Sequence, residues 1–130
     1  MSILSTILEN DINKTSKAVT KILRQTQEGE ISWRIDSREL FLGPEEHVTG
    51  QIYMTSILDK YLRIYKYYKP NKEVFVTNDT YFEGIKLQFT DYSGKPEWDF
   101  PYSNAVSDLY DAVAFKTTNV KEFLDKWLSD

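Results

Sequence analysis

The sequence predicts one α+β domain over residues 1–130: an N-terminal helix, an antiparallel β-meander of about five or six strands, and two C-terminal helices. Three observations predict this order. Apolar residues recur every three to four positions before residue 28, alternate with polar residues between residues 31 and 101, and return to helical spacing after residue 103. A chain of 130 residues can bury one substantial core and is short for two domains.

The first segment has the clearest helical pattern. Its acidic residues come early and its lysines come late, which complements the helix macrodipole. Gly29 suits the position after the last turn, so we expect the helix to end shortly before it. The apolar stripe consists of Leu4, Leu8, Ile12, Thr15, Val19, Ile22 and Thr26.

Strand patterns occupy residues 31–101. The cleanest alternation sets Ile85, Leu87 and Phe89 against Lys86, Gln88 and Thr90. A hairpin turn at residues 91–95 then leads into a strand with Trp98 and Phe100. Such alternation predicts an antiparallel sheet with one buried face and one solvated face.

The earlier part of this region has weaker signals. Residues 31–36 and 52–57 alternate in polarity, and residues 74–76 are a short apolar run typical of a strand. A turn is expected at Asp59–Lys60. Residues 52–68 also fit the spacing of a helix, but their β-branched and aromatic content favours strands.

Two helices are expected to close the chain. The first starts at Ser103–Asn104, and one face of it contains Val106, Leu109, Tyr110 and Val113. The second follows Asn119, which together with Glu122 resembles a capping box. The apolar residues of the second helix are Val120, Phe123, Leu124, Trp127 and Leu128.

The three tryptophans, Trp33, Trp98 and Trp127, are each in phase with the apolar face of their own element, which is typical of core residues. Trp127 needs a further condition, because its burial requires another element or another copy of the chain. If it is exposed, Trp127 forms with Phe123 an apolar patch that monomers rarely tolerate. Phe123, Trp127 and Leu128 are therefore the candidate interface residues.

The chain contains, in succession, the segments Tyr61–Tyr67, Ile85–Asp91, Trp98–Pro101, Leu109–Val113 and Val120–Asp125. Together these segments resemble a group of small stand-alone bacterial α+β proteins of uncharacterised function. The resemblance covers most of the chain and implies a layout of helix, sheet and helices. It brings no catalytic residues with it.

The segment from Lys60 to Lys72 has the most unusual composition. Five cations fall at every third position among four tyrosines, without a carboxylate. As a strand, this segment places Leu62 and Ile64 on one face. The other face then carries Tyr61, Arg63, Tyr65 and Tyr67.

This aromatic and basic face has two interpretations. If it is open, Arg63 pairs with a phosphate while the tyrosines stack on bases. The candidate ligand-binding residues are then Tyr61, Arg63, Tyr65, Lys66 and Tyr67. If a helix covers it, the same tyrosines form a packed ladder with the lysines at its rim. Tyrosines on strands pack against neighbours more often than they bind ligands, which favours packing.

Patterns of catalytic and metal-binding residues are sparse. The sequence has no cysteine, and its single histidine, His47, follows Glu45 and Glu46 without a second ligand at helical or strand spacing. The five glycines are scattered and form no phosphate-binding loop. We therefore expect neither an enzyme nor a bound metal or cofactor.

Hydropathy and charge bear on location and partners. No apolar run approaches the length of a membrane span, and the first residues lack the pattern of a secretory signal, so we expect a cytoplasmic protein. Residues 1–72 carry eleven Lys/Arg and nine Asp/Glu, whereas residues 73–130 carry five and eleven, so the two halves have formal charges of +2 and −6. Nucleic acid is therefore a possible but not a favoured partner, and unlike poles of two copies would attract.

These observations favour a non-enzymatic binding or regulatory module that acts through a protein interface, as a homodimer. The sparse catalytic groups, the division of charge and the apolar last helix support this interpretation. The alternative is a binder of a small molecule, a nucleotide or single-stranded nucleic acid, which would use the face formed by Tyr61, Arg63, Tyr65 and Tyr67.

Overall fold

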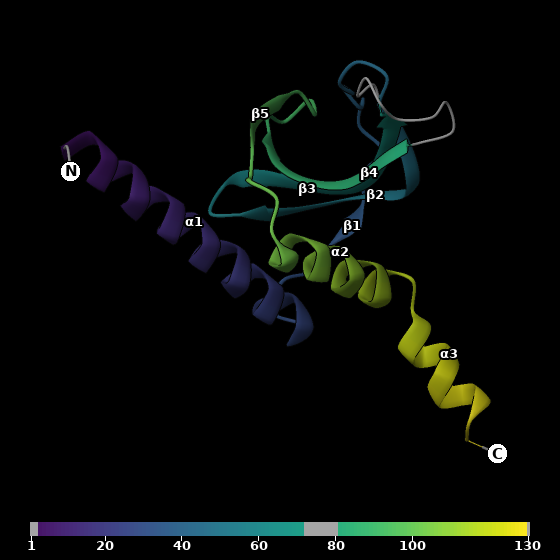
Figure 1. Cartoon of the computed structure of the whole chain (residues 1–130). Helices are drawn as coiled ribbons and strands as arrows, with labels where there is room; N and C mark the ends of the chain where they lie inside the picture. Colours follow the sequence, from purple (N-terminus) through teal and green to yellow (C-terminus); the bar gives the residue numbers. More distant parts are fainter. Residues whose placement is uncertain (1–2, 72–80, 130) are drawn as a thin grey trace.

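The computed structural model describes residues 3–71 and 81–129, with side chains in the first helix described from Asn10 onward. Its elements in chain order are α1 (Ile3–Gln27), β1 (Arg34–Ile35), β2 (His47–Ile57), β3 (Lys60–Pro70), β4 (Tyr81–Thr90), β5 (Pro96–Asp99), α2 (Asn104–Thr117) and α3 (Val120–Trp127) (Figure 1). This order confirms the predicted α+β class. No helix within these ranges is both long enough and apolar enough to cross a membrane.

The sheet is a meander of five strands in the order β1-β2-β3-β4-β5, and every neighbouring pair is antiparallel. Residues 52–68, which also fit a helix, lie in the β2–β3 hairpin, so the strand prediction is confirmed. Leu58 and Asp59 connect these two strands, one residue earlier than the predicted turn, and both have positive φ, 49° and 64°. The strand expected at residues 74–76 lies outside the described residues.

One face of the sheet, the helix face, packs against α1 and α2 (Figure 1). Leu62 and Ile64 of β3 and Leu87 of β4 point to it and are almost completely buried, as their alternation predicts. From the helices, the core receives Val19 of α1 and the predicted stripe of α2, namely Val106, Leu109, Tyr110 and Val113.

The opposite face is covered as well, which corrects the prediction of a solvated face. The chain between β1 and β2 (residues 36–46, the covering loop) and the turn between β4 and β5 lie against it. Arg63 on this face donates hydrogen bonds to the carbonyl oxygens of Glu39 in the loop and Gly94 in the turn. The loop and the turn contact this face through hydrogen bonds and ion pairs. The alternation of polar and apolar residues therefore gives no sign that the face is buried.

The tryptophans differ in burial. Trp33 is buried, and its Nε1 donates a hydrogen bond of 3.0 Å to Oγ1 of Thr26 in α1. Trp98 contacts Phe89 but stays 45% exposed, and Trp127 is 72% exposed. The prediction of core tryptophans is therefore correct for Trp33 alone, because β5 is an edge strand and α3 packs against little of the body.

The ends of the helices follow the predicted signals in two places. Gly29 adopts a φ of 80° after α1, and the Oγ atom of Ser103 accepts a hydrogen bond from the Val106 amide at the start of α2. The predicted capping box of α3 is wrong, since the Asn119 side chain makes no capping hydrogen bond. Asn119 instead has a φ of 57°, and this left-handed residue turns the chain between α2 and α3.

Candidate protein interface

The structure buries the centre of the predicted ligand-binding face. Arg63 and Tyr65 each have a relative exposure of 0%. The guanidinium group of Arg63 donates from Nε to Asp36 at 2.8 Å, from Nη1 to the Gly94 carbonyl at 2.8 Å and from Nη2 to the Glu39 carbonyl at 3.1 Å. Its donors are thus directed at protein acceptors, and a phosphate could reach them only after the covering loop had moved.

Asp36 is the centre of this buried network. Its carboxylate also accepts hydrogen bonds from Nε and Nη2 of Arg38, at 3.0 and 2.9 Å. Burial alone would raise the pKa of Asp36, but the hydrogen bonds from Arg38 and Arg63 outweigh it and lower the pKa to about 2. Asp36 therefore remains ionised at neutral pH and holds two guanidinium groups, one from the loop and one from the sheet.

A second ion pair fixes the far end of the covering loop. Lys86 of β4 approaches Glu46 at 2.7 Å, and the other carboxylate oxygen of Glu46 accepts a hydrogen bond of 2.7 Å from the Gly43 amide. Beside this pair, the buried hydroxyl of Tyr65 has no hydrogen-bond partner among the described residues. Burial raises the pKa of Tyr65 to about 12, so its hydroxyl stays neutral at physiological pH.

The other predicted ligand-binding residues do not form one surface. Lys66 belongs to the helix face, where its Nζ lies 5.0 Å from the ring centroid of Tyr110. Tyr61 is half-buried under Arg38, and Tyr67 is half-buried beside Lys86, at cation–ring distances of 5.1 Å in both cases. These contacts correspond to the packed alternative, with one correction: the cover is a loop rather than a helix.

His47 lies at the exposed start of β2, where its ring stacks on Tyr68 with a centroid distance of 5.2 Å. In residues 3–71 and 81–129 there is no group of three or more acidic or histidine side chains that could hold a metal ion. The described residues therefore offer no positive sign of a metal site.

The predicted interface residues are, in contrast, strongly exposed. Helix α3 contains no buried residue. The exposed fractions are 62% for Phe123, 40% for Leu124, 72% for Trp127 and 76% for Leu128. The rings of Phe123 and Trp127 stack at a centroid distance of 6.2 Å and an angle of 7°, so the two form one continuous apolar surface. We call these four residues the α3 apolar face.

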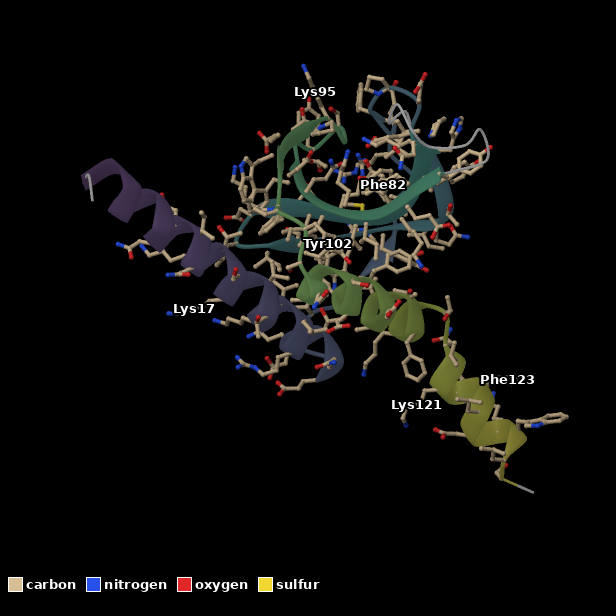
Figure 2. All side chains as sticks on the ribbon, in the orientation of Figure 1. Lys17, Phe82, Lys95, Tyr102, Lys121 and Phe123 are labelled. Carbon is tan, nitrogen blue, oxygen red and sulfur yellow. The ribbon has the colours of Figure 1, made fainter. Side chains whose placement is uncertain are left out.

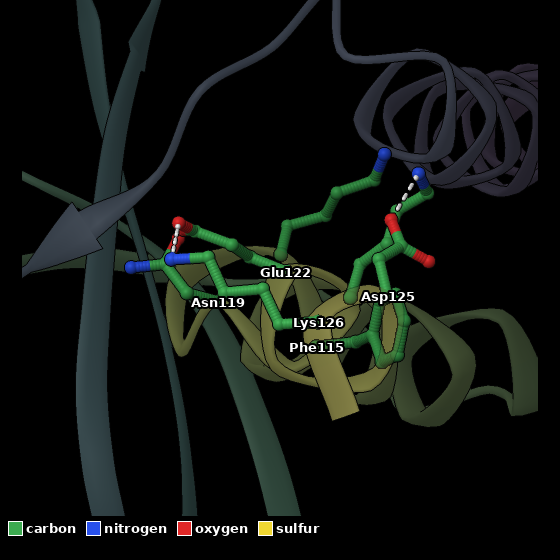
Figure 3. A pocket seen from close by; sticks show the side chains of 7 residues that line it. Phe115, Asn119, Glu122, Asp125 and Lys126 are labelled. Atoms are coloured by element: carbon green, nitrogen blue, oxygen red, sulfur yellow. Dashed lines mark hydrogen bonds and ion pairs between the residues drawn. The ribbon is translucent and has the colours of Figure 1, made fainter. Parts of the chain in front are cut away.

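In a typical amphipathic helix the apolar side faces the body of the protein, whereas in α3 the charged side does. A cavity of about 500 Å³ lies where α3 leaves α2, beside Phe115 (Figure 3). Among the described residues, the part of α3 that lines this cavity consists of charged residues: Lys121, Glu122, Asp125 and Lys126. The helix thus turns its charged side towards its own body.

The charged side is internally paired. Lys121 lies 3.3 Å from Asp125, and Lys126 lies 3.1 Å from Glu122, both with the spacing of one helical turn. These are the two dashed pairs in Figure 3. The helix projects beyond the end of α2 and away from the sheet, with Phe123 near its middle (Figure 2). Its apolar face is accordingly available to another molecule.

The structure exposes the predicted interface residues Phe123, Trp127 and Leu128, and the sequence analysis missed the acidic partners of the buried network, Asp36 and Glu46. The alternation of residues 31–36 gives no signal for Asp36, because this residue falls in the polar phase together with Ser32 and Arg34. Comparison of the chain with protein-family models, with curated proteins and with solved structures finds no match. The function must therefore be inferred from the geometry, and the α3 apolar face is a group of exposed apolar residues that packing within the described chain does not explain.

Proposed function

We propose that the chain is a non-enzymatic binding or regulatory module that acts through a protein interface, and that the α3 apolar face forms this interface. The observation that carries the proposal is the exposure of Phe123 and Trp127 on a helix whose charged side is turned towards its own body. Contiguous exposed apolar surface of this kind is typical of protein contacts. A homodimer, expected from the sequence, is one form of such a contact.

Aromatic anchors suit this role energetically. A fully buried Phe or Trp removes about 150–250 Å² from water, so the exposed parts of Phe123 and Trp127 amount to roughly 270 Å². At about 25 cal/mol per Å² this area contributes about 7 kcal/mol before costs. Association costs about 4–15 kcal/mol, so one copy's rings only roughly offset it and the partner must bring apolar surface of its own.

The alternative function, binding of a nucleotide or single-stranded nucleic acid by the β3 face, has less support. It requires an accessible Arg63, whereas the guanidinium is buried against Asp36. It also requires stacking surfaces, but Tyr65 is completely buried and Tyr61 and Tyr67 are half-buried. We therefore assign the interface to α3 and a structural role to the β3 face.

Photo-crosslinking in cells tests the proposal directly. A photo-reactive amino acid replaces Trp127 in one variant, and in the matched control it replaces Lys17, an exposed residue of α1. We expect a discrete covalent adduct with a protein from position 127 and a much lower yield from position 17. If position 127 gives no adduct above the control, the α3 apolar face is not a protein interface and the proposal is refuted.

A further inference from the structure

The residue pattern of α3 is nearly symmetric about its midpoint, which lies between Phe123 and Leu124. The sequence reads Val120-Lys-Glu-Phe before the midpoint and Leu-Asp-Lys-Trp127 after it. Apolar residues occupy both ends and the centre, and a cation and a carboxylate lie between them on each side. A helix with this symmetry can match a reversed copy of itself.

We propose that the partner of the α3 apolar face is a second copy of this chain, and that the two α3 helices pair antiparallel about a two-fold axis at this midpoint. The inference rests on the proposed protein interface and names its occupant. In this pairing Phe123 of one copy lies against Leu124 of the second copy, and Val120 lies against the second copy's Trp127. Each residue then meets a partner at the same height along the helix, as an isologous contact requires.

Charge complementarity on the flanks favours this arrangement. At 100° per residue, each flank of the apolar face carries a lysine at its edge and a carboxylate farther round the helix: Lys121 with Asp125 on one flank, and Lys126 with Glu122 on the other, consistent with the two ion pairs within the helix. A two-fold axis between antiparallel helices brings each flank against the same flank of the second copy. Lys121 then lies within about 1.5 Å, along the axis, of the second copy's Asp125.

The other flank matches equally. Glu122 lies at nearly the same height as the second copy's Lys126, so all four cross-pairs join opposite charges. All four side chains are between 62% and 77% exposed, which leaves them free to reorient towards a partner. Antiparallel packing also sets the two helix macrodipoles in the favourable sense.

A parallel pair would match the charges as well, but the shape of the molecule disfavours it. Helix α3 has eight residues and is therefore about 12 Å long. Paired helices lie about 8–10 Å apart, so a parallel pair would bring two bodies to the same end of this short element. The body lies at the N-terminal end of α3 (Figure 1), and an antiparallel pair therefore places the two bodies at opposite ends.

The small area of one such helix pair places it among weak interfaces, below about 1,200 Å² in total. We therefore expect exchange between monomer and dimer at micromolar concentration. Sedimentation velocity over a concentration series at low salt measures this exchange for the wild type. A strict monomer up to several hundred micromolar overturns the inference.

Charge variants test whether α3 pairs with itself. One variant, Glu122→Lys with Asp125→Lys, makes the helix wholly basic, and another, Lys121→Glu with Lys126→Glu, makes it wholly acidic. We expect each alone to lose at least tenfold in dimer affinity and their equimolar mixture to regain it. The variant with all four charges exchanged should dimerise like the wild type. If the separate variants dimerise as well as the wild type, or if the mixture stays monomeric, the inference is overturned.

Orientation needs a separate measurement, which the lack of cysteine in the chain makes straightforward. A short thiol-specific crosslinker is added to mixtures of single-cysteine variants. Antiparallel pairing predicts that Lys121→Cys crosslinks with Asp125→Cys and poorly with Glu122→Cys, and the reverse yields would overturn it. A monomeric wild type that nevertheless gives a photo-adduct with another protein from position 127 refutes the second copy and leaves the protein interface in place.

Discussion

Asp36 is the residue whose loss should destabilise this protein most directly through electrostatics. Its carboxylate and the guanidinium of Arg63 are both fully inaccessible in the ion pair, at a distance of 2.8 Å. We consider Asp36→Asn, which preserves the size of the side chain and removes its charge. The substitution leaves Arg63 charged, buried and without a counter-ion, and it also weakens the attachment of Arg38 in the covering loop.

Two independent considerations give the size of the effect. Removing one partner of a buried ion pair destabilises proteins by about 3–5 kcal/mol. The lowering of the Asp36 pKa from 3.8 to about 2 corresponds to about 2 kcal/mol of stabilisation of the folded state. Since Asn retains some hydrogen bonding, we expect a loss of about 2–4 kcal/mol. Domains typically have a free energy of unfolding of about 5–15 kcal/mol, so this loss is a large part of the total.

Urea unfolding followed by circular dichroism measures this loss. The matched control is Asp125→Asn, which removes a carboxylate from an exposed ion pair whose side chains are 68–75% accessible. It should change stability by less than about 0.5 kcal/mol. The double variant Asp36→Asn/Arg63→Met should be more stable than Asp36→Asn alone, because it removes the uncompensated charge. A loss below about 1 kcal/mol for Asp36→Asn would show that the pair is solvated and that the covering loop is open in solution.

Three further predictions concern stability. Because the Asp36 pKa is lowered from 3.8 to about 2, its stabilisation should be complete above pH 3.8 and lost as the pH falls towards 2, and acid titration of Asp36→Asn should lack that part of the loss. Leu87→Ala should destabilise by about 2–5 kcal/mol in urea, since Leu87 is completely buried, and an unchanged midpoint would contradict the β4 register. Replacing Leu58-Asp59 by Asn-Gly should raise the melting temperature, because both residues have positive φ and a residue unsuited to this conformation costs about 1–2 kcal/mol. A lower melting temperature would show that the exposed Leu58 side chain contributes packing.

The elements that the sequence predicts well are those whose signal is apolar and periodic. The stripe of α2 and the alternation of Ile85, Leu87 and Phe89 both appear in the structure at the predicted positions, because each buries one face against a single layer. The covered face was not predictable in the same way. Its packing depends on Asp36, Arg63 and Glu46, which come together only through a loop that crosses the sheet, and no local periodicity records such a contact.

The candidate site shows the same division. Exposed and buried aromatic residues have the same sequence pattern, so the spacing of Phe123 and Trp127 predicts an apolar face without indicating what covers it. The left-handed Asn119 decides the outcome, because it turns α3 away from the body. An Asn that is followed by a Glu three residues later resembles a capping box. Only the backbone conformation of Asn119 shows that this residue instead forms a bend.

Because α3 contributes no buried residue, folding and association should respond to different substitutions. The described core extends from Val19 to Val113 and includes nothing from α3. Replacing both Phe123 and Trp127 by Ser should therefore leave the urea midpoint within about 0.5 kcal/mol of the wild type, as for surface sites in general. The same variant should lose association in sedimentation, whereas Leu87→Ala should lose stability and keep its α3 contacts while folded. If the Ser variant unfolds at a markedly lower urea concentration under conditions where the wild type is monomeric, α3 packs against its own chain and its apolar face is part of the core.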